Sequence, residues 1–255
     1  MTEDQPRLVV RVRDKGRAKP VPPEQRFVFN NITTKGQDFS GRTLESFSVS
    51  ESTFESCRFD RLRLTRNYAQ LGNGQKQAVY RDCSFDGAKI HGMGIGGFYR
   101  FERCSFRNVD LRNWFCAGAI DIVDCVFTGK LRKAVFMGAP PDEMRAQYRR
   151  DRNEFCGNDF SGAQLFDVGF RNGIDLTQQR LPMGPDYLYI PEAAGTLRAA
   201  WAEAITWTEL EIRRVVLIWL GIGIEDMNRG QKQFHLRPKD SYGFGDMKRD
   251  MHRDG

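Results

Sequence analysis

The sequence predicts a mainly β protein in which the chain coils through four short sides per turn and ends in a helical segment. Three observations support this prediction. Apolar residues recur at every fifth position, a longer period of about 20 residues is superimposed on this spacing, and both patterns stop after Leu176. Because a helix repeats its apolar face every 3.6 residues and a flat strand every two, neither accounts for a period of five.

The five-residue spacing is clearest between Asp38 and Thr65. Its apolar positions there are Phe39, Leu44, Val49, Phe54, Phe59 and Leu64. After interruptions the spacing returns at Tyr80, Phe85 and Ile90, at Phe101, Phe106, Leu111 and Cys116, at Ile122 and Phe127, and at Phe155, Phe160, Leu165 and Phe170. A chain that turns a corner every five residues would point the centre of each unit inward.

The longer period is visible in four copies of a Cys-X-Phe pattern. The copies begin at Cys57, Cys83, Cys104 and Cys125, and the first interval is longer than the two equal intervals that follow it. A period of about 20 residues corresponds to four five-residue sides, and we expect six such coils. The structural core is then expected to contain one column of phenylalanines and one of cysteines, formed by Phe39, Phe59, Phe85, Phe106, Phe127 and Phe160 and by Cys57, Cys83, Cys104 and Cys125.

Several units carry the pattern of a known family. Segments 38–41, 83–87, 88–90, 109–113 and 163–165 resemble units of the pentapeptide-repeat family, and the resemblance covers about residues 37–176. It implies a right-handed quadrilateral β-helix. Some members of this family resemble B-DNA in size and negative charge and bind DNA gyrase, so the resemblance also raises a DNA-mimic function.

The chain outside the repeats is expected to form three further parts. Residues 1–36 form an N-terminal arm or strand cap in which basic residues outnumber acidic ones. Residues 177–227 form a helical cap or dimerisation segment, with one helix over 192–220 whose second apolar face contains Trp207, Leu210 and Leu217. Residues 228–255 lack a pattern and are expected to be a loose charged tail.

Two insertions interrupt the repeats near 67–77 and 139–153, and insertions of this kind project from a repeat body. The second contains Pro140-Pro141-Asp142-Glu143, a typical helix start, followed by several arginines. A solvated basic surface is one interpretation, and a docking element for an acidic partner is the other. The candidate partner-binding residues of this insertion are Arg145, Tyr148, Arg149, Arg150 and Arg152.

The residues needed for catalysis or for binding metals are sparse. The three histidines, His91, His235 and His252, have no metal-ligand spacing, and a cysteine ladder would place sulfurs in a line instead of a tetrahedron. The glycine-rich segment 92–97 lacks the spacing of a phosphate-binding loop. We therefore expect no catalytic residues, no metal, no cofactor and no enzymatic activity.

These observations favour a protein–protein interaction scaffold, with a protein partner and with a homodimer through the C-terminal helix left open. Gyrase binding as a DNA mimic is an alternative, but the net charge of +6 has the wrong sign for it. Nucleic-acid binding through the basic arm and the insertion is a second alternative, and we do not expect it because no aromatic platform accompanies the basic residues. No secretory signal or membrane span is expected, so the cytoplasm is the expected location.

Overall fold

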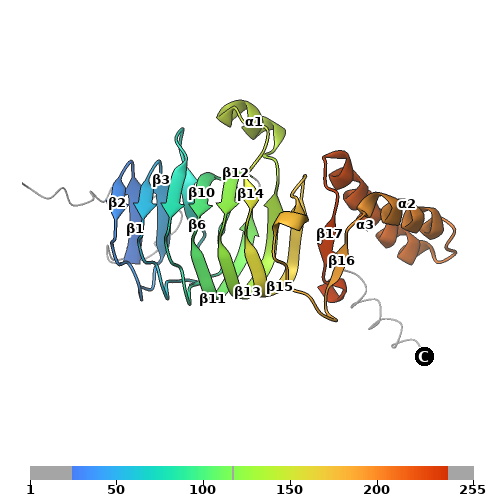
Figure 1. Cartoon of the computed structure of the whole chain (residues 1–255), viewed down its shortest axis with the longest axis horizontal. Helices are drawn as coiled ribbons and strands as arrows, with labels where there is room; N and C mark the ends of the chain where they lie inside the picture. The colour runs from blue at the N-terminus through green and yellow to red at the C-terminus, as the bar shows by residue number, and fades with distance from the viewer. Residues whose placement is uncertain (1–24, 117, 241–255) are drawn as a thin grey trace, which may run out of the picture.

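The protein is mainly β, with parallel sheets followed by a pair of C-terminal helices (Figure 1). The computed structural model describes residues 25–116 and 118–240. The greater part of the predicted N-terminal arm, and the end of the predicted tail from 241 to 255, lie outside the described residues.

Three parallel sheets make up the body. Sheet A contains β1 (Arg26–Asn30), β3 (Ser46–Ser50) and β6 (Ala69–Asn73). Sheet B contains β2 (Thr33–Lys35), β4 (Thr53–Glu55), β7 (Ala78–Arg81), β10 (Phe98–Glu102), β12 (Ala119–Val123) and β14 (Phe155–Cys156). Sheet C contains β5 (Arg63–Leu64), β8 (Lys89–Ile90), β11 (Ser105–Phe115), β13 (Val126–Met137) and β15 (Asp159–Arg171), with β9 (Gly94–Ile95) paired to β11.

Neighbouring strands within a sheet come from successive passages of the chain. Phe27 of β1 pairs with Phe47 of β3, and Tyr99 of β10 pairs with Ile120 of β12, so the two partners of each pair are one long period apart in sequence. The repeat period of the sequence is therefore the separation along the chain between paired strands. Figure 1 shows the strands stacked along the long axis of the molecule.

The chain turns sharply between sheets through residues in the left-handed backbone conformation. Arg103, Asn108 and Asn113 follow one another at every fifth position, with φ angles of 51°, 55° and 55°. Asparagine and glycine tolerate this conformation better than most residues, which explains why small polar residues recur between the apolar positions. Because of these turns, the apolar side chains of all three sheets point to the interior.

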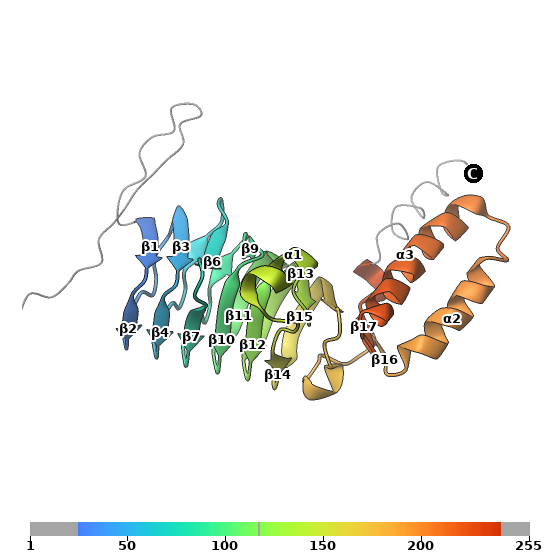
Figure 2. The same cartoon turned by 90° about the horizontal axis from the view of Figure 1, so that it is seen from above.

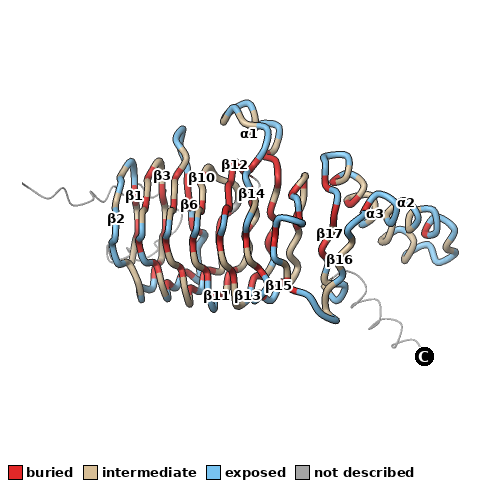
Figure 3. Tube along the Cα trace, viewed as in Figure 1, coloured by how far each residue is buried: buried red, intermediate tan, exposed pale blue. Residues whose placement is uncertain are grey.

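A continuous stack of aromatic rings runs through the core, beside buried aliphatic and cysteine side chains. Six phenylalanines form one column whose successive ring centroids lie 4.5 to 5.0 Å apart, namely Phe39, Phe59, Phe85, Phe106, Phe127 and Phe160. All of them are buried except Phe39, which is half-buried at the first end of the column. Figure 3 shows buried residues in every layer of the stack.

The two predicted insertions differ in the structure. Much of the first, 67–77, is not a loop: residues 69–73 form β6, because Ala69 and Leu71 bury their side chains in the same alternation as β3. The second contains the short helix α1 (Asp142–Tyr148), which follows Pro141 and ends at Arg149 in the left-handed conformation. Of the two insertions, this one projects from the side of the stack as a helix (Figure 1).

The end of the body is covered by a two-stranded antiparallel sheet, and the helices lie in the chain between its two strands. The antiparallel strands β16 (Leu188–Ile190) and β17 (Phe234–Leu236) lie next to β15, with two 3₁₀ turns nearby at Leu176–Gln178 and Pro238–Asp240. His235 of β17 packs against Phe170 and Tyr187. Residues 228–240 are thus part of the fold, contrary to the expectation of a tail that begins at 228.

The expected single helix over 192–220 is also corrected. The structure has two antiparallel helices, α2 (Ala193–Ala204) and α3 (Leu210–Asn228), which project away from the stack (Figure 2). The break contains Thr206, whose hydroxyl donates to the Glu203 carbonyl at 2.7 Å, and Trp207. β-Branched and aromatic residues are weaker helix formers than the alanines before them, so the chain turns there. None of the helices in the described ranges has the length and apolar character needed to cross a membrane.

Candidate interaction surfaces

The insertion that contains α1 is attached to sheet B through a buried carboxylate. Asp121 of β12 is 3% exposed and accepts hydrogen bonds from both terminal nitrogens of Arg150. The same carboxylate accepts from the Gln77 side chain at 2.8 Å and from the Glu154 backbone N–H at 2.7 Å. A buried charge needs such partners to offset its lost hydration.

An aromatic contact completes this attachment. The ring of Tyr148, at the end of α1, lies 4.2 Å from the ring of Phe98 between centroids. Tyr148 and Arg150 therefore hold the insertion against the body, which leaves them less available to a partner than the sequence suggested.

The remaining arginines of the insertion differ in their surroundings. Arg145 donates to the Pro140 carbonyl at 3.1 Å and lies 3.5 Å from the Asp142 carboxylate. Arg149 and Arg152 are exposed, and none of the ion pairs in the described residues involves their side chains. Two of the five candidate residues of this insertion thus remain as free cations.

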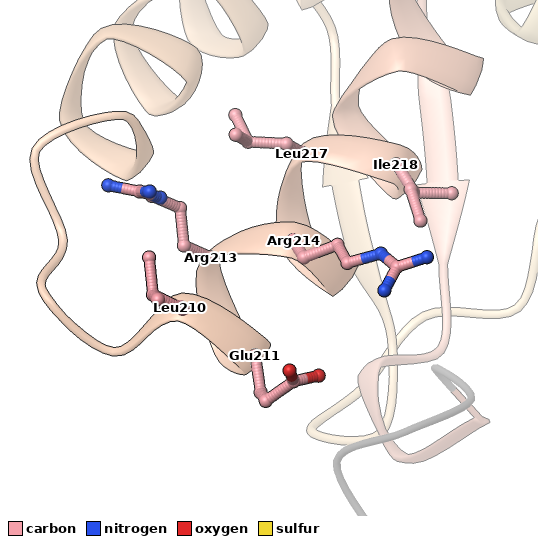
Figure 4. A pocket seen from close by; sticks show the side chains of 6 residues that line it. All are labelled: Leu210, Glu211, Arg213, Arg214, Leu217 and Ile218. Atoms are coloured by element: carbon pink, nitrogen blue, oxygen red, sulfur yellow. The ribbon is translucent and has the colours of Figure 1, made fainter.

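The helix pair carries the second candidate surface. Leu210 and Leu217 line one shallow hollow of about 510 Å³ on α3, together with Ile218 and three charged residues (Figure 4). Trp207 does not line it: the residue lies in the connection between the helices, where its carbonyl accepts from Arg213 at 3.2 Å. The structure therefore brings together two of the three predicted apolar residues.

The helices approach each other closely on their inner side. A Cβ atom added at Gly223 of α3 would lie 3.1 Å from Leu197 of α2, so glycine permits this contact. The inner side of α3 packs against α2, whereas Leu210, Ile218 and Trp219 of α3 remain 64%, 54% and 43% exposed. α3 is apolar on more sides than α2 can cover.

Polar side chains join the helix pair to the body. Arg171 of β15 donates to the Asp226 carboxylate of α3 at 2.7 Å, and burial raises the pKa of Asp226. Gln231 accepts from the backbone N–H groups of Gly173 and Ile174, at 3.0 and 3.1 Å. Gln231 itself lies in the segment expected to be a loose tail. The sequence does not reveal its contacts, because a glutamine is usually exposed.

The carboxylates of sheet B are paired with arginines. Glu55 lies 3.1 Å from Arg81, and Arg81 lies 3.5 Å from Glu102. Arg100 continues the series with Glu102 at 3.1 Å and Glu154 at 2.6 Å. This sheet presents alternating charges and not an acidic stripe.

The cysteine column is enclosed. Cys57, Cys83, Cys104 and Cys125 are buried, and all six cysteines are free. The Cys104 thiol donates to the Tyr80 carbonyl at 3.2 Å, and burial raises the pKa of this thiol. Within the described ranges no group of histidines, cysteines and carboxylates could hold a metal ion. The side chains that continue this column, Asn158 and Gln179, bond to each other at 3.1 Å.

Comparison with known proteins gives a distant structural likeness. No model of a known protein family matches the chain, and no curated protein matches its sequence. Two trypsin-treated variants of QnrB1, a plasmid-mediated fluoroquinolone resistance protein, resemble it in structure. One is 14% identical with a TM-score of 0.22, over 60% of this chain and 79% of that one. The other is 17% identical with a TM-score of 0.21, over 62% and 72%.

Proposed function

We propose that the protein is a non-enzymatic protein–protein interaction scaffold, in which a right-handed quadrilateral β-helix of the pentapeptide-repeat type carries a protein-binding helix pair. Turns at every fifth position, and strand partners separated by about 20 residues, support four sides per coil. The right hand follows the strong preference of parallel strand crossovers. Such a body stacks similar layers and is stiff along its length.

One observation carries the protein-binding function: the exposed apolar surface of α3. Leu210, Ile218 and Trp219 lie on a helix that projects beyond the β core, and their exposed fractions are 64%, 54% and 43%. Exposed apolar surface gathered on one element is typical of an interaction site. Aromatic anchors such as tryptophan are also enriched where proteins bind each other.

We take the partner to be a second copy of the chain. The hollow on α3 contains Glu211 beside Arg213 and Arg214, so the same surface offers apolar groups and both signs of charge. A surface with these features can be complementary to itself, as the two-fold contact of a homodimer requires. A helix of 19 residues is about 28 Å long, which allows a contact of useful extent.

The test is the oligomeric state in solution, measured by size-exclusion chromatography with light scattering at micromolar concentrations. We expect a dimer for the native chain and a monomer for Ile218→Glu, because the substitution places a charge in the apolar contact. Met183→Glu is the matched control, since Met183 is 72% exposed and lies outside the helices. A monomeric native chain, or a dimeric Ile218→Glu variant, would refute the proposed interface.

The DNA-mimic alternative receives less support from the described residues. A DNA mimic needs unpaired carboxylates in a continuous stripe, whereas the carboxylates of Glu55, Glu102 and Asp121 are engaged by arginines. We therefore rank gyrase binding below the scaffold function.

A further inference from the structure

The outer surface of sheet C and its two bordering turns carry a group of unpaired cations. We call this surface the basic face, and it is formed by Arg61, Arg63, Arg66, Lys89, Lys130 and Lys133. All six side chains are exposed. None of the ion pairs or side-chain hydrogen bonds found in the described part of the chain involves them.

The register of sheet C places these cations in rows. Leu64, Ile90 and Leu131 are buried in the core, so the residue before each one points outward. Arg63 pairs with Lys89, Lys89 with Asp110, and Asp110 with Lys130. Paired residues of adjacent strands lie about 4.8 Å apart, so this row crosses the sheet in a straight line.

Cations at the turns widen the surface on both sides of this row. Arg61 and Lys133 have φ angles of 56° and 54°, which are typical of the turns that border each side. Arg61 lies over the glycine of the next layer, since a Cβ added at Gly87 would be 3.3 Å from its side chain. Arg66 is exposed at the border with sheet A.

Few carboxylates offset this charge. Asp110 lies within the row, but Arg112 binds it at 3.0 Å and Arg132 lies 3.8 Å away. Arg112 lowers the pKa of Asp110 although burial opposes this effect. With these two arginines the surface has eight cations, and Glu45, Asp110 and Asp167 are carboxylates in or beside it. Asp60 and Asp86, at the turn that carries Arg61, lie 3.3 and 4.0 Å from Arg58 and Arg107. A strongly positive potential results over a surface built on regular strands.

The composition of the basic face indicates what it binds. Apart from Tyr68 at its border, the large apolar side chains that are exposed in the described residues lie elsewhere, mainly on the helices and their connection and on β16 and β17. A protein interface needs apolar or aromatic anchors at its centre, whereas contact with a phosphate backbone needs only cations and small polar groups. Among the described residues, Tyr68 is the exposed aromatic beside this face, 57% exposed and two residues from Arg66. A single ring at the border is not the series of aromatic platforms that stacks the successive bases of a single strand.

We propose that the basic face binds the phosphate backbone of a double-stranded nucleic acid without sequence specificity. This proposal goes beyond the scaffold function and departs from the expectation drawn from the sequence. That expectation considered the arm and the insertion, which are different parts of the chain. Here the cations are brought together by strand register alone.

The size of the surface sets the strength of binding. Five strands, β5 to β15, span about 19 Å at about 4.8 Å per step, and duplex DNA carries roughly 11 charges over that length. Not all of these face the protein, so six contacts are an upper limit. The logarithm of the binding constant should then fall with the logarithm of salt concentration with a slope no steeper than about −5.

The experiment measures binding of the full chain by fluorescence anisotropy over a range of salt concentrations. The probes are duplex DNA, duplex RNA, a single strand and polyglutamate. The face variant is Arg63→Gln, Lys89→Gln and Lys130→Gln. Two variants of equal charge change are controls: Lys76→Gln, Arg198→Gln and Lys232→Gln at other exposed positions, and Arg11→Gln, Arg13→Gln and Lys15→Gln in the arm. Thermal unfolding verifies that each variant is folded.

We expect the native chain to bind a duplex, and the face variant to lose on the order of 100-fold in affinity at about 0.1 M salt, with a slope shallower by about 3. The two controls should lose far less, and comparison of the two duplexes shows whether DNA or RNA is preferred. The proposal is overturned if no duplex binds at low salt, or if either control loses as much as the face variant. Polyglutamate binding as tight as duplex binding would overturn it in favour of an acidic protein, and tighter binding of the single strand would do so in favour of unpaired nucleic acid.

Discussion

Asp121 is the residue on which the position of the α1 insertion depends most directly. Its carboxylate is 3% exposed and binds Arg150, Gln77 and the backbone of Glu154, with Arg100 3.6 Å away. The substitution Asp121→Asn preserves the size of the side chain and removes its charge. One oxygen remains and can still accept from the Glu154 N–H, whereas the paired contact with Arg150 is lost.

The magnitude follows from the burial of the partners. Removing one partner of a fully buried ion pair costs about 3–5 kcal/mol. Here the side chains of Arg100 and Arg150 retain 19% and 21% of their exposure, and Arg100 keeps Glu102 and Glu154 as partners. We therefore expect a loss of about 2–3 kcal/mol in the free energy of unfolding. The contact of Tyr148 with Phe98, about 1 kcal/mol, is insufficient to hold the insertion in place by itself.

Two measurements check this prediction. Urea unfolding gives the change in stability, and hydrogen exchange should increase across residues 142–152 while the core strands stay protected. Asp124→Asn is the control, because Asp124 directly follows β12, is exposed, and takes part in none of the ion pairs of the described residues. A loss below about 0.5 kcal/mol, or unchanged exchange in the insertion, would refute the view that Asp121 holds it.

Two further predictions concern the core and the covered end of the stack. Phe106→Ala should lower the free energy of unfolding by about 3–5 kcal/mol, because its ring is fully buried and stacks 4.9 Å from Phe85 and 4.8 Å from Phe127. Phe39→Ala, at the half-buried end of the same column, should lower it clearly less in the same urea titration. For His235, burial lowers the pKa below 6.5, so the unfolded chain binds a proton that the native chain does not. The contribution of neutral His235 to the free energy of unfolding is then fully present above about pH 6.5, and at about pH 5.5 it has fallen by at most about 1.4 kcal/mol. The urea midpoints of His235→Gln should lack this part of the decline at low pH.

The mainly β fold could be predicted because its information is local. The five-residue spacing selects residues such as Val49, Phe54 and Phe59, which have no exposed surface in the structure. The interval between repeats equals the register difference between paired strands, for example between Phe27 and Phe47. A regular period therefore predicts which side chains point inward and also which strands are neighbours.

The surfaces could not be predicted because they depend on contacts distant in sequence. Arg150 binds Asp121 of β12, which lies 29 residues earlier in the chain, and an insertion rich in arginine gives no sign of which cation will be paired in this way. The basic face combines Arg63, Lys89 and Lys130, whose alignment follows only once the strand register is known. The break between α2 and α3 depends on modest differences in helix propensity, which a continuous apolar pattern obscures.

The two proposals lead to one joint prediction about duplex length. If α3 joins two copies, each dimer has two basic faces, and a duplex long enough to reach both is held at an effective concentration in the millimolar range. A single sequence-independent contact has a dissociation constant of about 10⁻⁴ to 10⁻⁶ M, so the second contact should raise affinity by at least about 10-fold.

The native chain and the monomeric Ile218→Glu variant should therefore bind a duplex of about 15 base pairs equally, whereas the native chain should bind one of about 60 base pairs more tightly and with a steeper salt dependence. Met183→Glu should behave like the native chain on both duplexes. Equal binding of the long duplex by the native chain and Ile218→Glu would mean that the two faces of a dimer do not bind the same duplex, even if each proposal holds separately.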